Sequence, residues 1–368
     1  MNAKRLSLLQ NALRAAGLDA LALNPGPSLV YLTGLHFHLS ERPVVMFFPL
    51  EGAPAIVLPE LEMQKMADLQ AEVKTFPYGE NPAGWETVFR AASDALGLEG
   101  KLVGVEPRSM RLLEFLQIQA ALNSTEWPEA EDIVGTLRLH KGVDEISAIR
   151  QAVGIAQAAL EATLSQIKIG MTEKELASEL VLQLLRRGSE PELPFFPIVS
   201  TGPNGANPHA VPSERKLQAG DLLVVDWGAV VDGYISDLTR TFSVGEVDEE
   251  YRKIHQIVLE ANAAGRAAGK PGLPCSAVDQ AARQVIEKSG YGEYFTHRTG
   301  HGIGLEAHED PYMRGDNPQL LEPGMVYTVE PGIYLPGRNG VRIEDNVVVM
   351  ETGTECLSDM PRELRQVG

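Results

Sequence analysis

Residues 222–244 have the sequence LLVVDWGAVVDGYISDLTRTFSV, in which two apolar strands flank a tight turn. Asp232-Gly233 is a strong signal for a two-residue hairpin turn, which requires a positive φ at both positions. This turn places position 226 opposite position 239. Because side chains alternate between the faces of a strand, Asp226 and Asp237 are then diagonal neighbours on one face. Such carboxylates repel each other unless a proton or a cation lies between them. The alternative is that one aspartate is a turn residue and the other is exposed to solvent.

A second acidic hairpin is predicted in residues 328–346, TVEPGIYLPGRNGVRIEDN. Strands on either side of a five-residue loop at 336–340 make Glu330 and Glu344 diagonal neighbours on one face. Glu330 follows an apolar run, where an unpaired carboxylate would be costly. Asp345 lies on the opposite face from Glu344 and is expected to pair with a basic side chain or with backbone groups.

Three of the eight histidines lie in residues 296–309, THRTGHGIGLEAHE, and a fourth, His209, lies in a loop-like stretch. The spacing of His301 and His308 does not place them on one helical turn, so this is not an HExxH zinc motif. A lone histidine is usually structural, but four in the glycine-rich loops of one domain favour ligand roles. Two Asp, two Glu and one His suit a pair of Mn, Co or Fe ions better than a structural zinc.

The composition is that of a globular chain. Apolar residues make up 44% and charged residues 22% of 368 residues, a length that favours two domains. The formal net charge of −18 disfavours nucleic acid and anionic membrane surfaces as partners. Cys275 and Cys356 lie far apart, which argues against a disulfide framework or a thiolate zinc site and favours a reducing, cytoplasmic compartment. No apolar stretch approaches the roughly 20 residues of a membrane span.

The N-terminal third alternates helices and strands, which predicts an α/β domain. Helices are expected at 3–16, 59–70, 82–97 and 108–122, and strands at 18–23, 44–48, 55–58 and 102–105. Residues 123–142 are the expected connection, so the domains are placed at 1–131 and 132–368. The second part predicts an α+β domain, with helices at 143–170, 173–187, 248–268 and 275–289. A capping box at Thr172 and Glu175 marks the start of the second of these helices.

Taken together, these motifs resemble the Xaa-Pro peptidases, prolidase and aminopeptidase P, within the metallopeptidase family of pita-bread fold. The similarity covers most of residues 190–350, in the segments IVSTGPNGANPHAVPSER, VVDWGAVVDGYISDLTRTFSVG, HRTGHGIGLEAHEDP, LLEPGMVYTVEPGIY and GVRIEDNVVV. A weaker similarity in the first third includes ALNPGPSLVYLTGL. The resemblance therefore implies an α/β, creatinase-like N-terminal domain followed by an α+β pita-bread catalytic domain.

The resemblance also implies two divalent metal ions per chain, manganese or cobalt first, with zinc or iron as alternatives. These ions would activate a water for attack on the carbonyl of an Xaa–Pro bond. The implied metal ligands are Asp226, Asp237, His301, Glu330 and Glu344. Asp237 and Glu344 would bridge the ions, and Glu330 is the implied proton shuttle.

Other side chains follow from the same resemblance. His209 and His308 would donate to the substrate carbonyl and to the oxyanion, and His297 and Tyr234 would orient the ligands. An Xaa–Pro bond is a tertiary amide without an N–H, so its site needs an apolar wall for the pyrrolidine ring. Phe195 or Phe196 is expected to supply that wall, and the alternative is that both belong to the core.

A dipeptidase must also bind the free carboxylate of its substrate, for which arginine is the natural partner. One prolidase lineage has an arginine four residues after the counterpart of His308, where this sequence has Tyr312. The remaining arginine candidates are Arg314, Arg342 and Arg42. Arg42 would reach the site from the N-terminal domain of the same chain or of a partner subunit, and Arg342 would otherwise brace Glu344.

The short chain favours an Xaa-Pro dipeptidase that acts on proline-containing dipeptides. Aminopeptidase P, which releases the first residue from longer Xaa-Pro peptides, is the alternative. A creatinase-like, metal-free amidinohydrolase would not need all five ligands, and a catalytically inactive pita-bread binding module would have lost some of them. A methionine aminopeptidase would not need residues 1–130. The resemblance also implies that the protein forms a homodimer.

Overall fold

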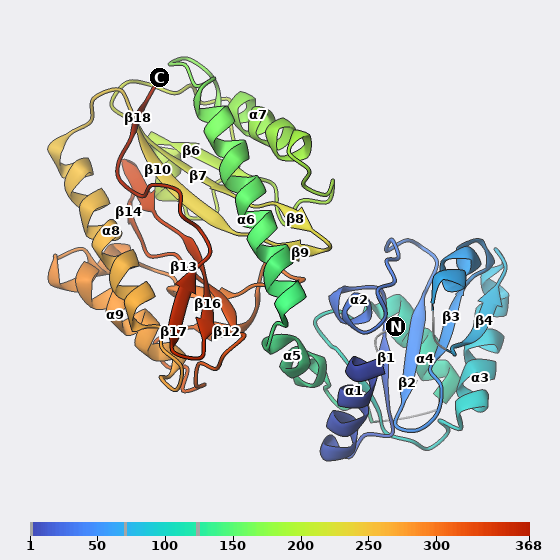
Figure 1. The fold of residues 1–368 in the computed structure, drawn as a ribbon. Coiled ribbons are helices and arrows are strands. Elements are labelled where there is room, and N and C mark those ends of the chain that lie inside the picture. Colours follow the sequence, from blue (N-terminus) through green and yellow to red (C-terminus); the bar gives the residue numbers. More distant parts are fainter. Residues whose placement is uncertain (1–2, 70–71, 123–125) are drawn as a thin grey trace. The chain divides into compact units, whose positions relative to one another are not determined.

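The computed structural model describes residues 3–69, 72–122 and 126–368 (Figure 1). The chain divides into two compact units, Met1–Arg138 and Leu139–Gly368. The boundary expected from the sequence, after residue 131, lies at the start of helix α5 (Glu131–Leu139). In the described ranges, every helix is too short or too polar to cross a membrane.

The N-terminal unit is built on a five-stranded mixed sheet with the order β4-β3-β2-β1-β5. Its strands are β1 (Ala20–Leu23), β2 (Val45–Pro49), β3 (Ala55–Pro59), β4 (Lys74–Tyr78) and β5 (Val103–Val105). Its other helices are α1 (Ala3–Ala16), α2 (Pro27–Thr33), α3 (Trp85–Leu96) and α4 (Leu112–Leu122). Every residue of β1, β2 and β3 is buried, so both faces of the sheet centre are covered.

This unit has the predicted α/β class, but several elements differ from the prediction. The expected helix at 59–70 is a 3-10 helix, η1 (Glu60–Asp68), and residue 70 lies outside the described ranges. Helix α2 was missed because Pro27 resembles a turn residue, although proline is well accepted at the first position of a helix. Strand β4 was missed because Pro77 interrupts it, which an edge strand tolerates. The expected connection at 123–142 contains α5, and residues 123–125 lie outside the described ranges.

Two larger sheets and two short ribbons are described in the C-terminal unit. One sheet has the order β18-β10-β7-β6 and the other β12-β11-β13-β16-β17. The strands of the first are β6 (Ile198–Thr201), β7 (Leu222–Trp227), β10 (Leu238–Val244) and β18 (Gln366–Val367). Those of the second are β11 (Gly300–Gly302), β12 (Glu309–Met313), β13 (Val326–Val329), β16 (Asp345–Met350) and β17 (Gly353–Cys356). The ribbons pair β8 (Val230–Val231) with β9 (Tyr234–Ile235), and β14 (Gly332–Leu335) with β15 (Asn339–Arg342).

The helices of this unit pack in two pairs on different parts of the sheets (Figure 1). They are α6 (Val143–Leu164), α7 (Glu173–Arg186), α8 (Glu249–Ala268) and α9 (Cys275–Lys288). Helices α6 and α7 share an apolar core with β7 and β10, and α8 and α9 share another with β14 and β15. The capping box before α7 is confirmed, because the Glu175 carboxylate accepts from the Thr172 backbone N–H at 2.8 Å. Helix α6 ends at Leu164, earlier than predicted.

The first hairpin has the predicted turn and register. Asp232 and Gly233 have φ values of 51° and 76°, as the two-residue turn requires. Thr239 lies opposite Asp226 in the antiparallel β7–β10 ladder. A Cβ at Gly228 would meet the Ser236 carbonyl oxygen at 2.0 Å, so the two arms approach closely between the ladder and the turn.

The second hairpin differs from the prediction, which placed a five-residue loop at 336–340. Asn339 pairs with Leu335 and Arg342 pairs with Gly332, so the loop is the three residues 336–338, with Gly337 at a φ of 72°. The pairing is therefore shifted by two residues, which leaves every side chain on its predicted face. The same register holds in β13–β16, where Val329 lies opposite Asp345, so positions 330 and 344 face each other directly between the two ladders.

Asp345 has the predicted kind of partner. Its carboxylate accepts from Arg240 at 2.9 Å, from Arg362 at 2.7 Å and from Ser358 at 2.8 Å. Burial alone would raise the pKa of Asp345, but Arg240 and Arg362 hold it at about 2. The acid is therefore charged and satisfied at neutral pH, and it secures the beginning of β16.

His255 gives the fold a dependence on pH. It is buried on α8, and its Nε2 has no hydrogen-bond partner among the described residues. Burial lowers the pKa of His255 to about 4, against a smaller opposite effect of Glu363. An unfolded histidine titrates near 6.5, so below that pH the unfolded state binds more protons and stability falls. We expect the free energy of unfolding to drop by roughly 1–2 kcal/mol from this residue between pH 7 and pH 5.

Urea denaturation of the wild type and His255→Leu at both pH values checks this expectation. The wild type should lose more stability than the variant as the pH falls. Parallel losses in the two proteins would contradict it.

Candidate metal centre

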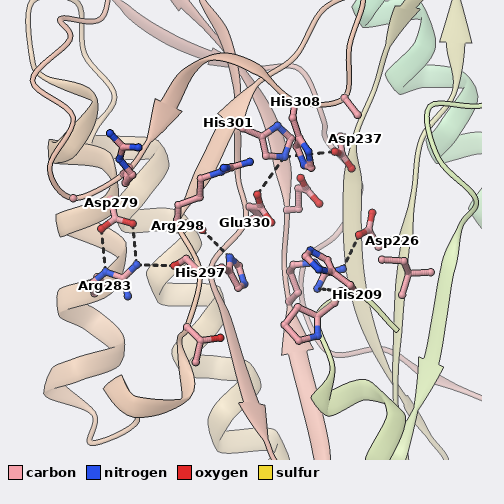
Figure 2. A pocket seen from close by; sticks show the side chains of 18 of the residues that line it. His209, Asp226, Asp237, Asp279, Arg283, His297, Arg298, His301, His308 and Glu330 are labelled. Carbon is pink, nitrogen blue, oxygen red and sulfur yellow. Dashed lines mark hydrogen bonds and ion pairs between the residues drawn. The ribbon is translucent and has the colours of Figure 1, made fainter. Parts of the chain in front are cut away.

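The predicted metal ligands come from five separate segments of the C-terminal unit. These are Asp226 in β7, Asp237 just before β10, His301 in β11, Glu330 after β13 and Glu344 after β15. All five line one cavity of about 1370 Å³. Figure 2 labels Asp226, Asp237, His301 and Glu330 in this cavity. The structure thus brings together carboxylates that lie more than a hundred positions apart in the sequence.

Backbone hydrogen bonds fix the positions of these carboxylates. Thr239 lies opposite Asp226 in the β7–β10 ladder, and its carbonyl oxygen accepts from the Glu344 N–H at 3.0 Å. The Thr239 hydroxyl also donates to the Glu344 carboxylate at 2.7 Å. Asp237 is held by the Asn346 side chain, which accepts from its N–H at 3.1 Å and donates to its carbonyl oxygen. The arrangement is therefore built into the strand pairing.

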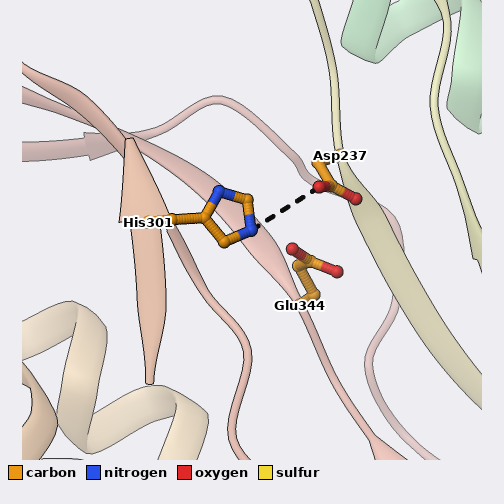
Figure 3. Close-up of side chains that lie close together, drawn as sticks. All are labelled: Asp237, His301 and Glu344. Atoms are coloured by element: carbon orange, nitrogen blue, oxygen red, sulfur yellow. Dashed lines mark ion pairs between the residues drawn. The ribbon is translucent and has the colours of Figure 1, made fainter. Parts of the chain in front are cut away.

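The centre of the cluster is formed by Asp237, His301 and Glu344 (Figure 3). Each of these buried residues offers one ligand atom, and these atoms all lie within 4.8 Å of one another. Glu330 adjoins the group, since its carboxylate lies 3.3 Å from His301 Nε2. Such a set of oxygen atoms and one imidazole nitrogen matches the coordination chemistry of divalent transition metals.

The charges of the cluster are not balanced by protein groups alone. Burial raises the pKa of Asp226, and burial together with neighbouring carboxylates raises the pKa of Asp237 and Glu344 well above the usual range. Glu330 differs, because burial raises its pKa but His301, His297 and Arg342 together lower it to about 2. A cation bound among these acids would favour their charged forms.

Asp226 supplies a further indication that a cation fits here. Its Oδ2 accepts from Arg342 at 2.6 Å, whereas its buried Oδ1 has no hydrogen-bond partner in the described parts of the chain. A buried oxygen without a partner is costly unless something outside the protein satisfies it. The donor set and this oxygen therefore fit the metal ions that the sequence predicts.

Arg342 is buried, and its guanidinium already donates hydrogen bonds to protein groups. We therefore propose that it holds metal ligands in place, rather than binding the substrate carboxylate for which it was a candidate. It donates to Asp226, to the Thr239 hydroxyl at 3.0 Å and to the Tyr334 hydroxyl at 2.9 Å. The acid that it holds directly is Asp226, while it reaches Glu344 through Thr239.

Tyr334 is a site residue that the sequence reasoning missed. Its hydroxyl lies 2.9 Å from His297 Nε2, and His297 Nδ1 lies 2.7 Å from the Arg298 carbonyl oxygen. Burial lowers the pKa of His297, which favours the neutral ring. That ring donates from Nδ1 and accepts the Tyr334 proton at Nε2, so it holds the tyrosine against Arg342. The available signal was the even spacing from Glu330 to Tyr334 in one strand-like segment.

The remaining predicted histidines and aromatic residues lie around the same cavity. His308 packs edge-on against His301 with ring centroids 4.3 Å apart, and its pKa falls to about 4 because of burial and the neighbouring His301 and Arg298. His209, Phe195 and Phe196 also line the cavity, and Phe196 is exposed. These residues line the cavity together with the predicted metal ligands.

Two predicted residues have other contacts. The Tyr234 hydroxyl donates to Glu145 of α6 at 2.5 Å, and Tyr234 is not among the described residues that line the cavity. Arg42 belongs to the N-terminal unit, where its guanidinium pairs with Glu80 at 3.0 Å. We therefore do not assign Tyr234 to orienting a ligand.

Comparisons with known proteins agree on the family. The model of metallopeptidase family M24 matches residues 147–351, and that of the creatinase/prolidase N-terminal domain matches residues 5–140. A probable dipeptidase PepE of Mycobacterium tuberculosis (strain ATCC 25618 / H37Rv) is 39% identical over 369 residues, covering 98% of this chain and 96% of the relative.

Two solved structures extend this similarity to the whole fold. A recombinant prolidase from Thermococcus sibiricus superposes with a TM-score of 0.94 at 35% identity, over 100% of both chains. An Xaa-Pro dipeptidase from Bacillus anthracis superposes with a TM-score of 0.89 at 33% identity, over 99% of each. The predicted pairing of a creatinase-like domain with a pita-bread domain is confirmed.

Proposed function

Because the chain belongs to metallopeptidase family M24, we propose that it hydrolyses the Xaa–Pro bond of dipeptides with two divalent metal ions. The observation that carries the proposal is the buried cluster of Asp237, His301 and Glu344, with Glu330 beside it and the unpartnered Asp226 oxygen in the same cavity. The similar proteins are named as a probable dipeptidase, a prolidase and an Xaa-Pro dipeptidase, which supports the same activity for this chain.

The metal ions would be held by Asp226, Asp237, His301, Glu330 and Glu344, and the central position of Asp237 and Glu344 suits them to serve both ions. When bound, such ions polarise a carbonyl and lower the pKa of water, which makes hydrolysis feasible near neutral pH. We propose manganese or cobalt as the metal, on the basis of the oxygen-rich donor set.

The protein groups around the cluster would complete the reaction. Glu330 would accept the proton of the attacking water and deliver it to the leaving proline nitrogen. His308, which is neutral at pH 7 because its pKa is about 4, would donate an N–H to the substrate carbonyl, together with His209. Phe195 and Phe196 would form the apolar wall for the pyrrolidine ring, which a tertiary amide substrate needs.

The other candidate functions make different demands on these residues. A metal-free amidinohydrolase or an inactive binding module has no need for the four acids and the histidine to converge, as they do here. An aminopeptidase P would use the same cluster but would accept substrates extended beyond proline. We also propose that the protein is a homodimer in the cytoplasm.

Removal and return of metal test the proposed activity. Protein treated with a chelator and then dialysed should lose hydrolysis of Ala-Pro, and manganese or cobalt should restore it. Elemental analysis should then find two ions per chain, and the metal-loaded protein should unfold at a higher temperature than the metal-free form.

Pro-Ala is the matched control substrate, because it has the same composition but no Xaa–Pro bond. No cleavage of Ala-Pro with manganese, cobalt, zinc or iron would refute the proposed function.

A further inference from the structure

Within the described parts of the chain, one cation that lines the active-site cavity has no carboxylate partner. Four arginines line the cavity, and three of them form ion pairs: Arg283 with Asp279 at 3.0 Å, Arg314 with Asp316 at 2.5 Å and Arg342 with Asp226 at 2.6 Å. The fourth, Arg298, makes no ion pair with any acid in the described residues. Its charge is therefore available to a ligand.

Arg298 is nevertheless held in place. Its guanidinium carbon lies 4.6 Å from the centroid of the Tyr312 ring, a cation–π contact. A cation–π contact does not use the N–H groups of a guanidinium as hydrogen-bond donors to another acceptor, and these groups match the two oxygens of a carboxylate. Figure 2 shows the Arg298 side chain reaching toward His301 and His308, at the edge of the metal cluster.

The backbone around Arg298 is equally fixed. Asp279 of α9 accepts from the Thr299 N–H and hydroxyl, both at 2.9 Å, and Arg283 donates to the His297 carbonyl oxygen at 2.7 Å. These contacts anchor the residues on both sides of Arg298 to one helix. A cation held on a rigid segment loses less freedom on binding than a mobile surface arginine.

We propose that Arg298 binds the C-terminal carboxylate of the dipeptide and so selects dipeptides over extended or amidated peptides. This inference rests on the proposed function. In an Xaa–Pro dipeptide the carboxylate is one carbon removed from the scissile nitrogen, so it must bind close to the metal cluster. That region already holds four acids, of which Asp226, Asp237 and Glu344 are buried, and a cation beside them offsets their repulsion of the substrate.

The other arginines meet these requirements less well. Arg314 is paired and exposed, and Arg342 is committed to Asp226, Thr239 and Tyr334. Arg42 is paired with Glu80 in the N-terminal unit. Arg298 alone among these four combines a fixed position at the cavity wall with an unpaired charge.

The test compares Ala-Pro with Ala-Pro-amide, which differ only in the charged group that Arg298 would bind. Manganese-loaded wild type should prefer the free acid. Arg298→Ala should lose about 10- to 100-fold in kcat/KM for Ala-Pro, chiefly through KM, with little change for the amide. Arg298→Lys, which keeps the charge but not the fork, should fall between them.

Controls separate this role from a structural one. Arg338→Ala removes an exposed arginine that pairs with Glu250 and should leave the preference unchanged. Metal content and unfolding temperature should match the wild type in every variant compared. Arg42→Ala and Arg314→Ala are measured with the same two substrates, and each should keep the preference for the free acid.

Several results would overturn the inference. Equal losses on both substrates in Arg298→Ala would mean that the residue positions His308 instead. A preference that disappears only in Arg42→Ala or Arg314→Ala would assign the carboxylate elsewhere, and a wild type without any preference would leave nothing for Arg298 to select. In these cases the proposed function stands, whereas a wild type that cleaves neither substrate would refute both proposals.

Discussion

Glu344→Gln is expected to lower kcat/KM for Ala-Pro by more than about 100-fold and, at the same time, to stabilise the metal-free protein. Substitution of groups that only support metal ligands lowers metal affinity or activity by about 10- to 100-fold. Glu344 would bind the ions directly, so its loss should have a larger effect. The substitution should also reduce the number of metal ions bound per chain.

The gain in stability has a separate physical cause. Glu344 is buried, and burial together with Glu330 and Asp226 raises its pKa well above the usual range. Without metal, the charged carboxylate is therefore costly. Glutamine has the same shape and can still accept the Thr239 hydroxyl bond, so the neutral side chain should add roughly 1–2 kcal/mol to the free energy of unfolding.

Calorimetry with a chelator, elemental analysis and kinetics together measure the three effects. Glu214→Gln is the matched control, because this exposed glutamate makes only a surface ion pair with Lys174, and such pairs contribute little to stability. The prediction is wrong if Glu344→Gln binds two ions and keeps its activity, or if its metal-free form unfolds more easily than the wild type.

Arg342→Met is expected to destabilise the protein by about 3–5 kcal/mol, the usual effect of removing one partner from a buried ion pair. The arginine is buried, and its loss leaves Asp226 without its cation and the Thr239 and Tyr334 hydroxyls without their donor. Activity should fall by about 10- to 100-fold because a metal ligand is no longer held in place.

Urea denaturation with and without manganese measures this effect. The loss should be smaller in the metal-loaded protein, since a bound ion can replace part of the missing positive charge beside Asp226. Arg342→Lys keeps the charge and should be destabilised less, and Arg338→Ala controls for loss of an exposed arginine. A destabilisation of the metal-free Arg342→Met variant below about 1 kcal/mol would contradict the expectation.

Local chemistry explains which parts of the fold could be predicted from the sequence. Asp232-Gly233 specifies a turn by its backbone preferences, so the pairing of Asp226 with Thr239 followed. Asn339-Gly340 looks like the end of a loop but belongs to a strand. A Cβ at Gly340 would meet the Gly205 carbonyl oxygen at 1.8 Å, so the glycine is required by a neighbouring chain segment that no local pattern reveals.

The candidate site shows the same limit. Its acids could be proposed because carboxylates are unusual beside apolar strand residues, and its histidines because four of them lie in glycine-rich loops. The full ligand set came from the family resemblance. Tyr334 and Arg298 could not be proposed from the sequence. The role of Tyr334 depends on its contacts in the folded structure, and that of Arg298 on the absence of an acidic partner among the described residues. Arg342 was predicted as a carboxylate partner or a brace for Glu344, but its direct pairing with Asp226 joins two hairpins and depends on the tertiary fold.

Strand β16 lacks the alternation of polar and apolar residues that normally specifies pairing, because Val347, Val348 and Val349 are all apolar and buried. If the register of this strand shifted by one residue, Asp345 would take the position of Glu344, and a different carboxylate would enter the cluster. Asn346 prevents this exchange, since a valine in its place cannot satisfy the N–H and carbonyl of Asp237. Each buried group left unpaired would cost about 1–3 kcal/mol, so one amide side chain ensures that the correct acid faces the metal cluster.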